Sequence, residues 1–290
     1  MRTRFLLTLL IGLLCPIAWC AEYFNHIGLA EGLTQPSVMA IHQDRLGRMW
    51  FGTREGINRY DGSQITVFKG WIQPTGNTPA IWLGNEVHSI AEDDNGNLYF
   101  LIEDEIIRYD LYKEQFARLP QKRKISALHA AEGHIWYIGN DSLFCYETKS
   151  SADTFVADVR SYSPVRCLNV QKDRIYIGTL NGMLTIDRHS QQADLSLKGI
   201  EVYRIFESAR KELWIGTRMD GLYRKLPTDI RPVKVPYQPG SPEGISSEQI
   251  RDFVEDDEGN IWFGTFDGLH KYDASTHRYS LIQIPRYIGD

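Results

Sequence analysis

Short apolar runs, rich in aromatic and β-branched residues, recur along the whole chain and are bounded by Gly, Asp and Asn. Such runs predict β-strands, and no stretch keeps the 3.6-residue period of an amphipathic helix. The clearest run joins an aromatic strand to Gly-Thr and occurs at residues 49–53, 175–179, 213–217 and 261–265. Two degenerate copies lie between the first and second of these, at residues 98–101 and 135–139.

The aromatic residues of these six runs divide the chain into units of similar length. Successive aromatic anchors lie 49, 37, 40, 38 and 48 residues apart. A strand and an Asp- and Gly-bearing turn precede an anchor, and two further apolar runs follow it. Four strands in a unit of about 40 residues are typical of propeller blades. The anchors are Trp50, Tyr99, Trp136, Tyr176, Trp214 and Trp262.

These repeats predict an all-β fold, a β-propeller of four-stranded blades with six recognisable repeats. One blade cannot bury both of its faces alone, and blades packed side by side around an axis cover each other. Residues 23–27 also read as a strand, ahead of the first repeat. Because an N-terminal strand can complete the last blade of a ring, we expect six blades of a seven-bladed ring, with the remaining strands of the seventh beyond Asp290.

The repeated residues have structural roles in this prediction. The aromatic anchors are expected to fill the space between blades, and the Asp-x-x-Gly segments to form turns. Residues 93–96 lack the later Glu of a calcium loop, so we expect no metal there. Glycines that allow close packing or a bulge beside the turn are Gly52, Gly178, Gly216 and Gly264.

The first twenty residues differ from the repeats. Two arginines precede an apolar run over residues 5–17, and small residues at positions 18 and 20 follow it. This order predicts a signal peptide over residues 1–20, cut after Cys20, and the run is shorter than a membrane-spanning helix needs. A lipid-modified cysteine and an uncleaved anchor are the alternatives. We therefore expect residues 21–290 to form an exported propeller with no membrane contact beyond the signal peptide.

Composition and charge narrow the possible partners. The 290 residues are 42% hydrophobic and 24% charged, which is typical of a globular protein, and the net charge is −5. Nucleic acid is not an expected partner, because phosphate binding needs clustered Lys and Arg. Cys145 and Cys167 remain after the signal peptide; export permits a disulfide, and two buried thiols are the alternative. Neither has metal-ligand spacing, so no cofactor is expected.

The segment from Glu31 to Ile41, followed by residues 47–53 and 56–62, resembles the opening of two-component regulator propellers. The resemblance covers roughly residues 22–282 and is specific at repeats one, four, five and six. It implies the exported sensor region of a hybrid two-component system of Bacteroidetes, located in the periplasm. Members of the family sense nutrients, often breakdown products of glycans, and signal through an immunoglobulin-like domain and a membrane helix to a histidine kinase.

This chain departs from that plan, since neither a membrane helix after residue 20 nor a kinase segment occurs in it. We therefore expect either a fragment of a longer sensor or a protein that binds without transducing. The expected partners are an oligosaccharide ligand and the rest of a hybrid sensor kinase or a second copy of the chain.

Two long linkers point to a binding face. If the strands of each blade alternate in direction, the turn between the second and third strands lies on the same face as the linker to the next blade. Long loops in a compact domain are often functional, and the linkers over residues 69–86 and 235–248 carry aromatic residues that suit sugar rings. The alternative is that these loops pack on the rim or contact another domain. The predicted ligand-binding residues are Arg54, Trp71, Trp82, Arg218, Asp220, Tyr237 and Asp267.

No catalytic motif accompanies the repeats. Gly-x-Ser-x-Gly, His-Glu-x-x-His and a phosphate-binding glycine loop are all missing from the sequence, so we expect no catalytic residues and no enzyme. The function predicted is a periplasmic ligand-sensing propeller region of a two-component regulator. The alternatives are a protein-interaction scaffold and a propeller glycosidase or lyase.

Overall fold

The structure is a computed structural model that describes residues 24–73, 80–282 and 284. The predicted signal peptide lies outside the described residues. All the strands belong to one compact unit, Ile27–Ile284. The described residues contain strands, turns and one three-residue 3₁₀ helix, η1 (Arg160–Tyr162), and no α-helix.

The strands form six antiparallel four-stranded sheets, and in each sheet neighbours along the chain are neighbours in space. We number these sheets as blades one to six. Blade one consists of β1 (Val38–Gln43), β2 (Met49–Thr53), β3 (Gly56–Tyr60) and β4 (Ile65–Phe68). Blade two consists of β7 (Val87–Glu92), β8 (Asn97–Ile102), β9 (Glu105–Asp110) and β10 (Gln115–Arg118). Blade three consists of β11 (Ile125–Ala131), β12 (His134–Gly139), β13 (Ser142–Glu147) and β14 (Asp153–Asp158).

The second half of the chain repeats this arrangement. Blade four consists of β15 (Val165–Val170), β16 (Arg174–Thr179), β17 (Gly182–Asp187) and β18 (Ala193–Ser196). Blade five consists of β19 (Val202–Glu207), β20 (Leu213–Thr217), β21 (Leu222–Lys225) and β22 (Val233–Lys234). Blade six consists of β23 (Ile250–Glu255), β24 (Ile261–Thr265), β25 (Gly268–Asp273) and β26 (Arg278–Leu281). A separate two-stranded hairpin joins blades one and two, formed by β5 (Trp71–Ile72) and β6 (Ile81–Trp82).

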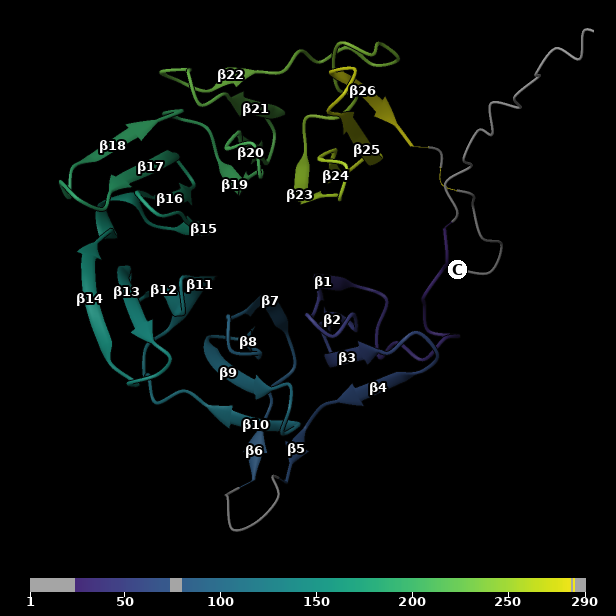
Figure 1. The fold of residues 1–290 in the computed structure, drawn as a ribbon, viewed down its shortest axis with the longest axis vertical. Coiled ribbons are helices and arrows are strands. Elements are labelled where there is room, and N and C mark those ends of the chain that lie inside the picture. Colours follow the sequence, from purple (N-terminus) through teal and green to yellow (C-terminus); the bar gives the residue numbers. More distant parts are fainter. Residues whose placement is uncertain (1–23, 74–79, 283, 285–290) are drawn as a thin grey trace, which may run out of the picture. The chain divides into compact units, whose positions relative to one another are not determined.

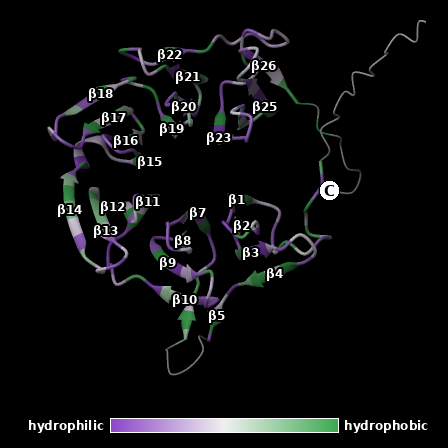
Figure 2. Cartoon of the chain, viewed as in Figure 1, coloured by the Kyte–Doolittle hydropathy of each residue, from purple (hydrophilic) through white to green (hydrophobic). Residues whose placement is uncertain are grey.

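The blades follow one another around a central axis, with the first strand of each blade innermost and the fourth outermost (Figure 1). The predicted β-propeller of four-stranded blades with six repeats is therefore confirmed. Figure 2 shows hydrophobic stretches in every blade, so that no single blade holds the core. A propeller buries its apolar residues between blades instead.

Five apolar clusters occupy the five junctions between successive blades, and an aromatic anchor lies in each of them. Trp50 packs against β8 residues of blade two, and Trp214 packs against Ile250, Ile261 and Tyr272 of blade six. Both indoles are fully buried. The predicted role of the anchors is thus confirmed at five positions. Trp262 of blade six belongs to no cluster among the described residues and is partly exposed.

The repeated glycines after the anchors explain how closely the blades approach. A Cβ atom added at Gly52 would lie 2.6 Å from Val87 Cγ1, and one at Gly216 would lie 2.7 Å from Ile250 Cγ2. At Gly178 the added atom would lie 2.8 Å from the Val202 carbonyl oxygen. Each contact is with the innermost strand of the next blade, so these glycines do allow close packing. Around Gly264 no described atom lies within 4 Å of such a Cβ.

The Asp-bearing turns bind the polar groups of anchor side chains. Asp44 accepts hydrogen bonds from the backbone N–H groups of Leu46 and Arg48 with one oxygen, and from the Trp50 indole at 2.8 Å with the other. Asp93 and Asp256 repeat this pattern with Tyr99 and Trp262. These carboxylates therefore serve the turns. In the described part of the chain, no three His, Cys, Asp or Glu side chains gather closely enough to hold a metal ion.

The segment ahead of blade one differs from the prediction. Residues 24–27 form no strand in the structure, so the strand predicted over residues 23–27 is wrong where it is described. The segment that follows instead folds over blade one, where Asn58 accepts a hydrogen bond from the Thr34 backbone at 3.0 Å and Leu33 is buried. The seventh blade stays a prediction. Cys145 and Cys167 are both free thiols, and no described helix has the length and apolar character to span a membrane.

Candidate functional site

The innermost strands place backbone groups along the axis. β1, β7, β11, β15, β19 and β23 are each the edge strand of their sheet, with one hydrogen-bonded neighbour. An edge strand presents a row of N–H and C=O groups on its other side, and in Figure 1 that side faces the centre. The axis is therefore lined by polar backbone before any side chain is considered.

A β-bulge breaks each of these six strands at the same place. In blade one Val38 pairs with Thr53 and Ala40 with Gly52, which leaves Met39 as the extra residue. The same shift occurs in every other blade. A bulge bends the strand and turns a side chain away from the regular alternation. The six extra residues are Met39, His88, Ser126, Arg166, Tyr203 and Arg251.

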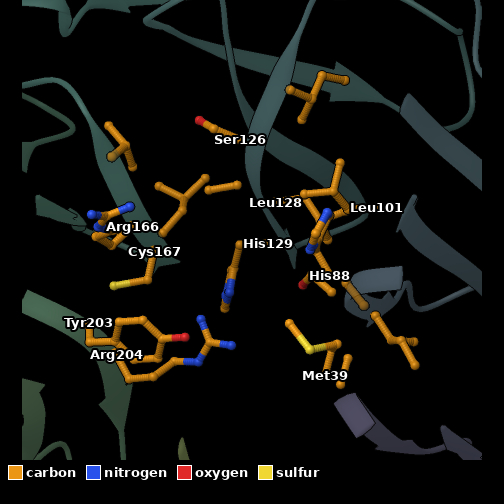
Figure 3. A pocket seen from close by; sticks show the side chains of 18 of the residues that line it. Met39, His88, Leu101, Ser126, Leu128, His129, Arg166, Cys167, Tyr203 and Arg204 are labelled. Carbon is orange, nitrogen blue, oxygen red and sulfur yellow. The ribbon is translucent and has the colours of Figure 1, made fainter. Parts of the chain in front are cut away.

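Five of these six bulge residues line a pocket of about 590 Å³. The pocket, which we call the axial pocket, is formed by the innermost strands of all six blades, and Figure 3 shows Met39, His88, Ser126, Arg166 and Tyr203 around it. Other positions of the same strands supply apolar groups such as Leu128. The pocket thus combines a polar, varied end with apolar walls, as small-molecule sites do.

Ion pairs hold the arginines at this end of the pocket. Arg166 Nε lies 2.8 Å from Glu201 Oε1, and Arg218 Nη1 lies 3.5 Å from the other oxygen of the same carboxylate. Arg204 Nε lies 3.4 Å from Asp252 Oδ1. Side chains that are held in this way lose less conformational entropy when a ligand binds.

Two guanidinium groups lie close to the Tyr203 ring. The Cζ atoms of Arg204 and Arg251 are each 5.5 Å from the centre of its ring, and Arg251 is also 5.7 Å from the centre of the Phe266 ring. These separations are within the range of cation–π attraction. The result is a surface of alternating cationic and aromatic groups across blades five and six.

Two titratable groups inside the pocket are neutral at pH 7. Desolvation lowers the pKa of His129 to about 4, so the imidazole carries no charge. Burial raises the pKa of Cys167 to about 11, so the thiol is protonated and a poor nucleophile. Figure 3 shows the His129 ring and the Arg204 guanidinium turned toward each other. These two groups therefore add no charge to the pocket.

The turns and linkers that were predicted to share a face do so. Gly56 donates a backbone hydrogen bond to the Asn85 carbonyl at 2.9 Å, and Gly221 donates one to the Glu248 carbonyl at 2.8 Å. The bulge residues lie at this same end of the blades, because each directly follows the linker. Arg218 reaches the axial pocket through Glu201, and Asp267 follows Phe266 in its turn.

The remaining predicted residues lie apart from the axial pocket. Trp71 and Trp82 pair across the β5–β6 hairpin, with ring centres 5.7 Å apart and exposures of 70% and 40%, and Figure 1 shows this hairpin on the outside of the blades. Arg54 lies 4.0 Å from Glu86, and Asp220 lies 3.7 Å from Lys234. Tyr237 is exposed in the second linker. As binding residues, all seven stay a prediction.

Sequence reasoning did not select the six bulge residues, although a signal for them exists. When the repeats are aligned on their anchors, the position after Val38, Val87, Ile125, Val165, Val202 and Ile250 holds a different kind of residue in almost every blade. Positions that pack between blades repeat, because every junction imposes the same shape. A position that varies inside a regular repeat is free of that constraint.

The fold and this pocket define a class of protein, a β-propeller with an axial pocket lined by non-repeating side chains. The family model described as "Two component regulator propeller" matches residues 32–55 and 244–267. Each match begins at the linker glycine before blade one or six and ends in the turn after its second strand. The chain therefore matches the two-component regulator propeller model in two of its repeats, which confirms the resemblance found in the sequence.

A curated relative and several solved structures agree with this family. A 39-residue stretch is 44% identical to Histidine kinase P4 of Formosa agariphila and covers 13% of this chain and 3% of that protein. The extracellular domain of a hybrid two component system from B. thetaiotaomicron matches with a TM-score of 0.65 at 20% identity, over 86% of this chain and 33% of that one. The chain therefore spans about a third of that domain.

Two further solved propellers share the fold at lower sequence identity. A second extracellular domain of a hybrid two component system from B. thetaiotaomicron matches with a TM-score of 0.55 at 18% identity, over 84% of this chain and 41% of that one. A virginiamycin B lyase from Staphylococcus aureus matches with a TM-score of 0.62 at 14% identity, over 86% of this chain and 85% of that one. At these identities the likeness shows the fold alone.

Proposed function

We propose that this chain is the ligand-sensing region of a two-component regulator of the hybrid histidine kinase type, exported to the periplasm by its N-terminal signal peptide. The regulator repeats and the similarity to extracellular sensor domains support this proposal. The rest of a sensor kinase, or a second copy of the chain, is the partner that would receive the signal.

The observation that carries the proposal is the set of six bulges. Every innermost strand has a bulge at the same place, and the extra residue of the bulge differs in type in almost every blade. They bring non-repeating side chains together at one end of the axis. A binding role accounts for both the constant position and the varied residues.

The ligand we propose is a glycan-derived oligosaccharide. Sugar rings offer apolar C–H faces and hydroxyl groups, and the pocket offers the Tyr203 ring, charged side chains and the edges of six strands. A volume of about 590 Å³ lies within the usual range of small-molecule sites. The region binds its ligand and leaves it chemically unchanged.

Calorimetric titration with a panel of oligosaccharides tests this function. We expect at least one to bind, and Tyr203→Ala to weaken that binding roughly tenfold or more. Phe155→Ala is the control, because this exposed ring lies on the outer strand of blade three. Trp71→Ala tests the hairpin as the competing site. Mass spectrometry of the bound sugar should show no cleavage.

Three results would contradict the proposal. If no sugar binds, the sensing function is wrong. If Trp71→Ala abolishes binding and Tyr203→Ala does not, the site is the hairpin and the axial pocket is wrong. If the sugar is cleaved and the cleavage depends on a carboxylate of the pocket, the chain is a propeller glycosidase or lyase.

One observation favours a scaffold as the second candidate. A groove of about 920 Å³ runs along the outer strand β18 to residues 230–232, and Ile230 beside it is 93% exposed. β18 is an edge strand, and edge strands can pair with an extended peptide. Loss of a protein partner on Ile230→Asp, with sugar binding absent, would support the scaffold.

A further inference from the structure

The turns between the second and third strands differ between the two halves of the ring. In blades one, two and three these turns consist of polar residues, whereas in blades four, five and six each turn carries a large apolar side chain. These side chains are Leu180, Met219 and Phe266, and they are 45%, 65% and 70% exposed. Because turns of this kind share one face and the three blades are consecutive (Figure 1), the side chains form a row, which we call the apolar arc.

We propose that the apolar arc is the surface where a second copy of this chain docks, face to face, about a two-fold axis that runs along blade five. This inference goes beyond the proposed function, because it concerns a surface outside the axial pocket. Leu180, Met219 and Phe266 do not line that pocket. The identity of the sugar therefore plays no part in the argument.

The fold itself does not require apolar residues at these turns. Blades one, two and three build the same turn from residues 54–55, 103–104 and 140–141, all of them polar. An apolar side chain at an exposed turn gains nothing from the core of its blade. Exposed apolar patches on folded proteins mark surfaces that bind other proteins, and Met and Phe are enriched in such interfaces.

Backbone hydrogen bonds hold the arc in one arrangement. The Asn181 carbonyl of the blade-four turn accepts a hydrogen bond at 3.3 Å from Gly199, in the linker to blade five. Gly221 of the blade-five turn donates one at 2.8 Å to the Glu248 carbonyl, in the linker to blade six. Turns and linkers thus form a continuous surface across three blades. A surface that is already ordered loses little conformational entropy when a partner binds.

Charges of opposite sign flank the centre of the arc. Arg218 Nη1 lies 3.5 Å from Glu201, in the linker from blade four. Asp220 Oδ1 lies 3.7 Å from Lys234 Nζ, which also lies 3.3 Å from Glu248 in the linker to blade six. The cation and the anion of the blade-five turn therefore lie on opposite sides of it, one toward each neighbouring blade.

This order of charges makes the arc complementary to itself. A two-fold axis along blade five places Arg218 of each copy opposite Asp220 of the other, and Leu180 opposite Phe266. Each contact of such an interface occurs twice, so both charges of both copies are paired. A partner of one strong charge would leave either the cation or the anion facing its own sign. Both copies are acidic, and contact at a patch with both signs of charge limits the repulsion between them.

Sedimentation equilibrium of the purified chain tests the inference. We expect a monomer–dimer equilibrium in the micromolar range. Met219→Asp should weaken it at least tenfold, because two carboxylates would then meet at the axis. Leu46→Asp is the matched control, since Leu46 is 51% exposed but lies in the turn between the first and second strands of blade one, at the opposite face. Sugar binding should be the same in all three proteins.

Two charge reversals test the two-fold arrangement. Arg218→Glu and Asp220→Lys should each weaken self-association at least tenfold, because each places like charges opposite one another at both contacts. In a mixture of the two variants every such contact again joins a cation to an anion. The mixture should therefore dimerise about as tightly as the unmodified chain. Circular dichroism and thermal unfolding establish that the variants fold.

Several outcomes would overturn the inference. The chain could stay monomeric up to about 100 μM, or Met219→Asp and Leu46→Asp could associate equally well. Folded charge-reversal variants that dimerise alone, or that stay monomeric when mixed, would also contradict it. If the chain sediments with anionic lipid vesicles and Met219→Asp does not, the arc is a membrane surface. None of these results touches sugar binding, and a chain that dimerises through the arc but binds no sugar would overturn the proposed function alone.

Discussion

Blades five and six contain the same tryptophan in two different surroundings. Trp214 is fully buried, with its ring 4.9 Å from the centre of Tyr272 of the next blade and the Arg224 guanidinium 4.8 Å away. Trp262 occupies the same position in β24, has Lys271 Nζ 4.6 Å from its ring and remains partly exposed. The difference between the two is a following blade, which covers Trp214 among the described residues and does not cover Trp262.

The hydrogen bonding of the two indole N–H groups shows the opposite difference. Trp262 Nε1 donates a hydrogen bond to Asp256 at 2.7 Å. In blade five the corresponding turn residue is Ser208, and Trp214 Nε1 has no partner among the described atoms. The turn and the neighbouring blade therefore stabilise an anchor separately. Trp214 is covered by the neighbouring blade but lacks the hydrogen bond from its indole N–H, and Trp262 has that hydrogen bond but is less covered.

The largest expected effect is at the anchors themselves. Trp214→Ala should lower the free energy of unfolding by about 3–5 kcal/mol, because it empties a filled junction. Trp262→Ala should lower it by roughly 1–2 kcal/mol, since part of that ring already contacts water. Urea unfolding measures both. Equal losses would mean that blade six is covered as completely as blade five.

The repeated glycines give the next effect in size. Gly216→Ala should cost about 1–3 kcal/mol, because the new Cβ would lie 2.7 Å from Ile250 and the two blades must move apart. Gly264→Ala has open space around the new atom, and alanine suits a strand better than glycine. We expect it to change stability by less than about 0.5 kcal/mol. A large loss at Gly264 would contradict the comparison, and melting temperatures suffice to decide it.

The smallest effect concerns the turns. Ser208→Asp should provide an acceptor for Trp214 Nε1 and raise stability by about 1 kcal/mol, while Asp256→Ser should lower it by a similar amount. Burial raises the pKa of Asp256, but hydrogen bonds from Trp262 and Asn260 outweigh it and hold the pKa below its ordinary value. A carboxyl whose pKa is lowered on folding stabilises the native state above the ordinary value of 3.8 and loses that effect as the pH falls.

The pH dependence of the free energy of unfolding tests whether the introduced carboxylate causes the gain from Ser208→Asp. The benefit of Ser208→Asp should be present at pH 7 and should decline as the pH falls below about 4, where the carboxyl takes up a proton. Ser208→Asn is the control, because its amide oxygen accepts the same bond without titrating. A gain from Ser208→Asp that persists unchanged at pH 3 would show that the carboxylate is not the cause.

The repeating part of the fold was predictable from the sequence. Anchors such as Trp50, glycines such as Gly52 and the Asp44 turn recur because every junction needs the same shapes, and recurrence is visible in one sequence. The face shared by turns and linkers followed from strand direction alone. The strand expected over residues 23–27 was wrong where it is described, because the segment that follows packs Leu33 and Thr34 over blade one in irregular form.

The candidate site was less accessible to sequence reasoning. A bulge depends on the register between two strands, and an apolar pattern such as Val202-Tyr203-Arg204-Ile205 does not show where that register shifts. The two aromatic residues predicted to bind a sugar, Trp71 and Trp82, pair with each other on the β5–β6 hairpin. Their residue type suits a sugar site, but the sequence alone does not show that this hairpin lies on the outside of the blades. Arg218 alone of the seven enters an ion pair at the axial pocket.

The bulges also bear on how such a protein changes over time. A bulge residue has no partner in the strand ladder, so replacing it leaves the hydrogen bonds, the anchors and the glycine contacts of its blade untouched. The six positions around the axis can then vary without breaking the strand ladders that build the ring. Single substitutions can therefore change which ligand the pocket binds, while the fold that forms the pocket stays the same.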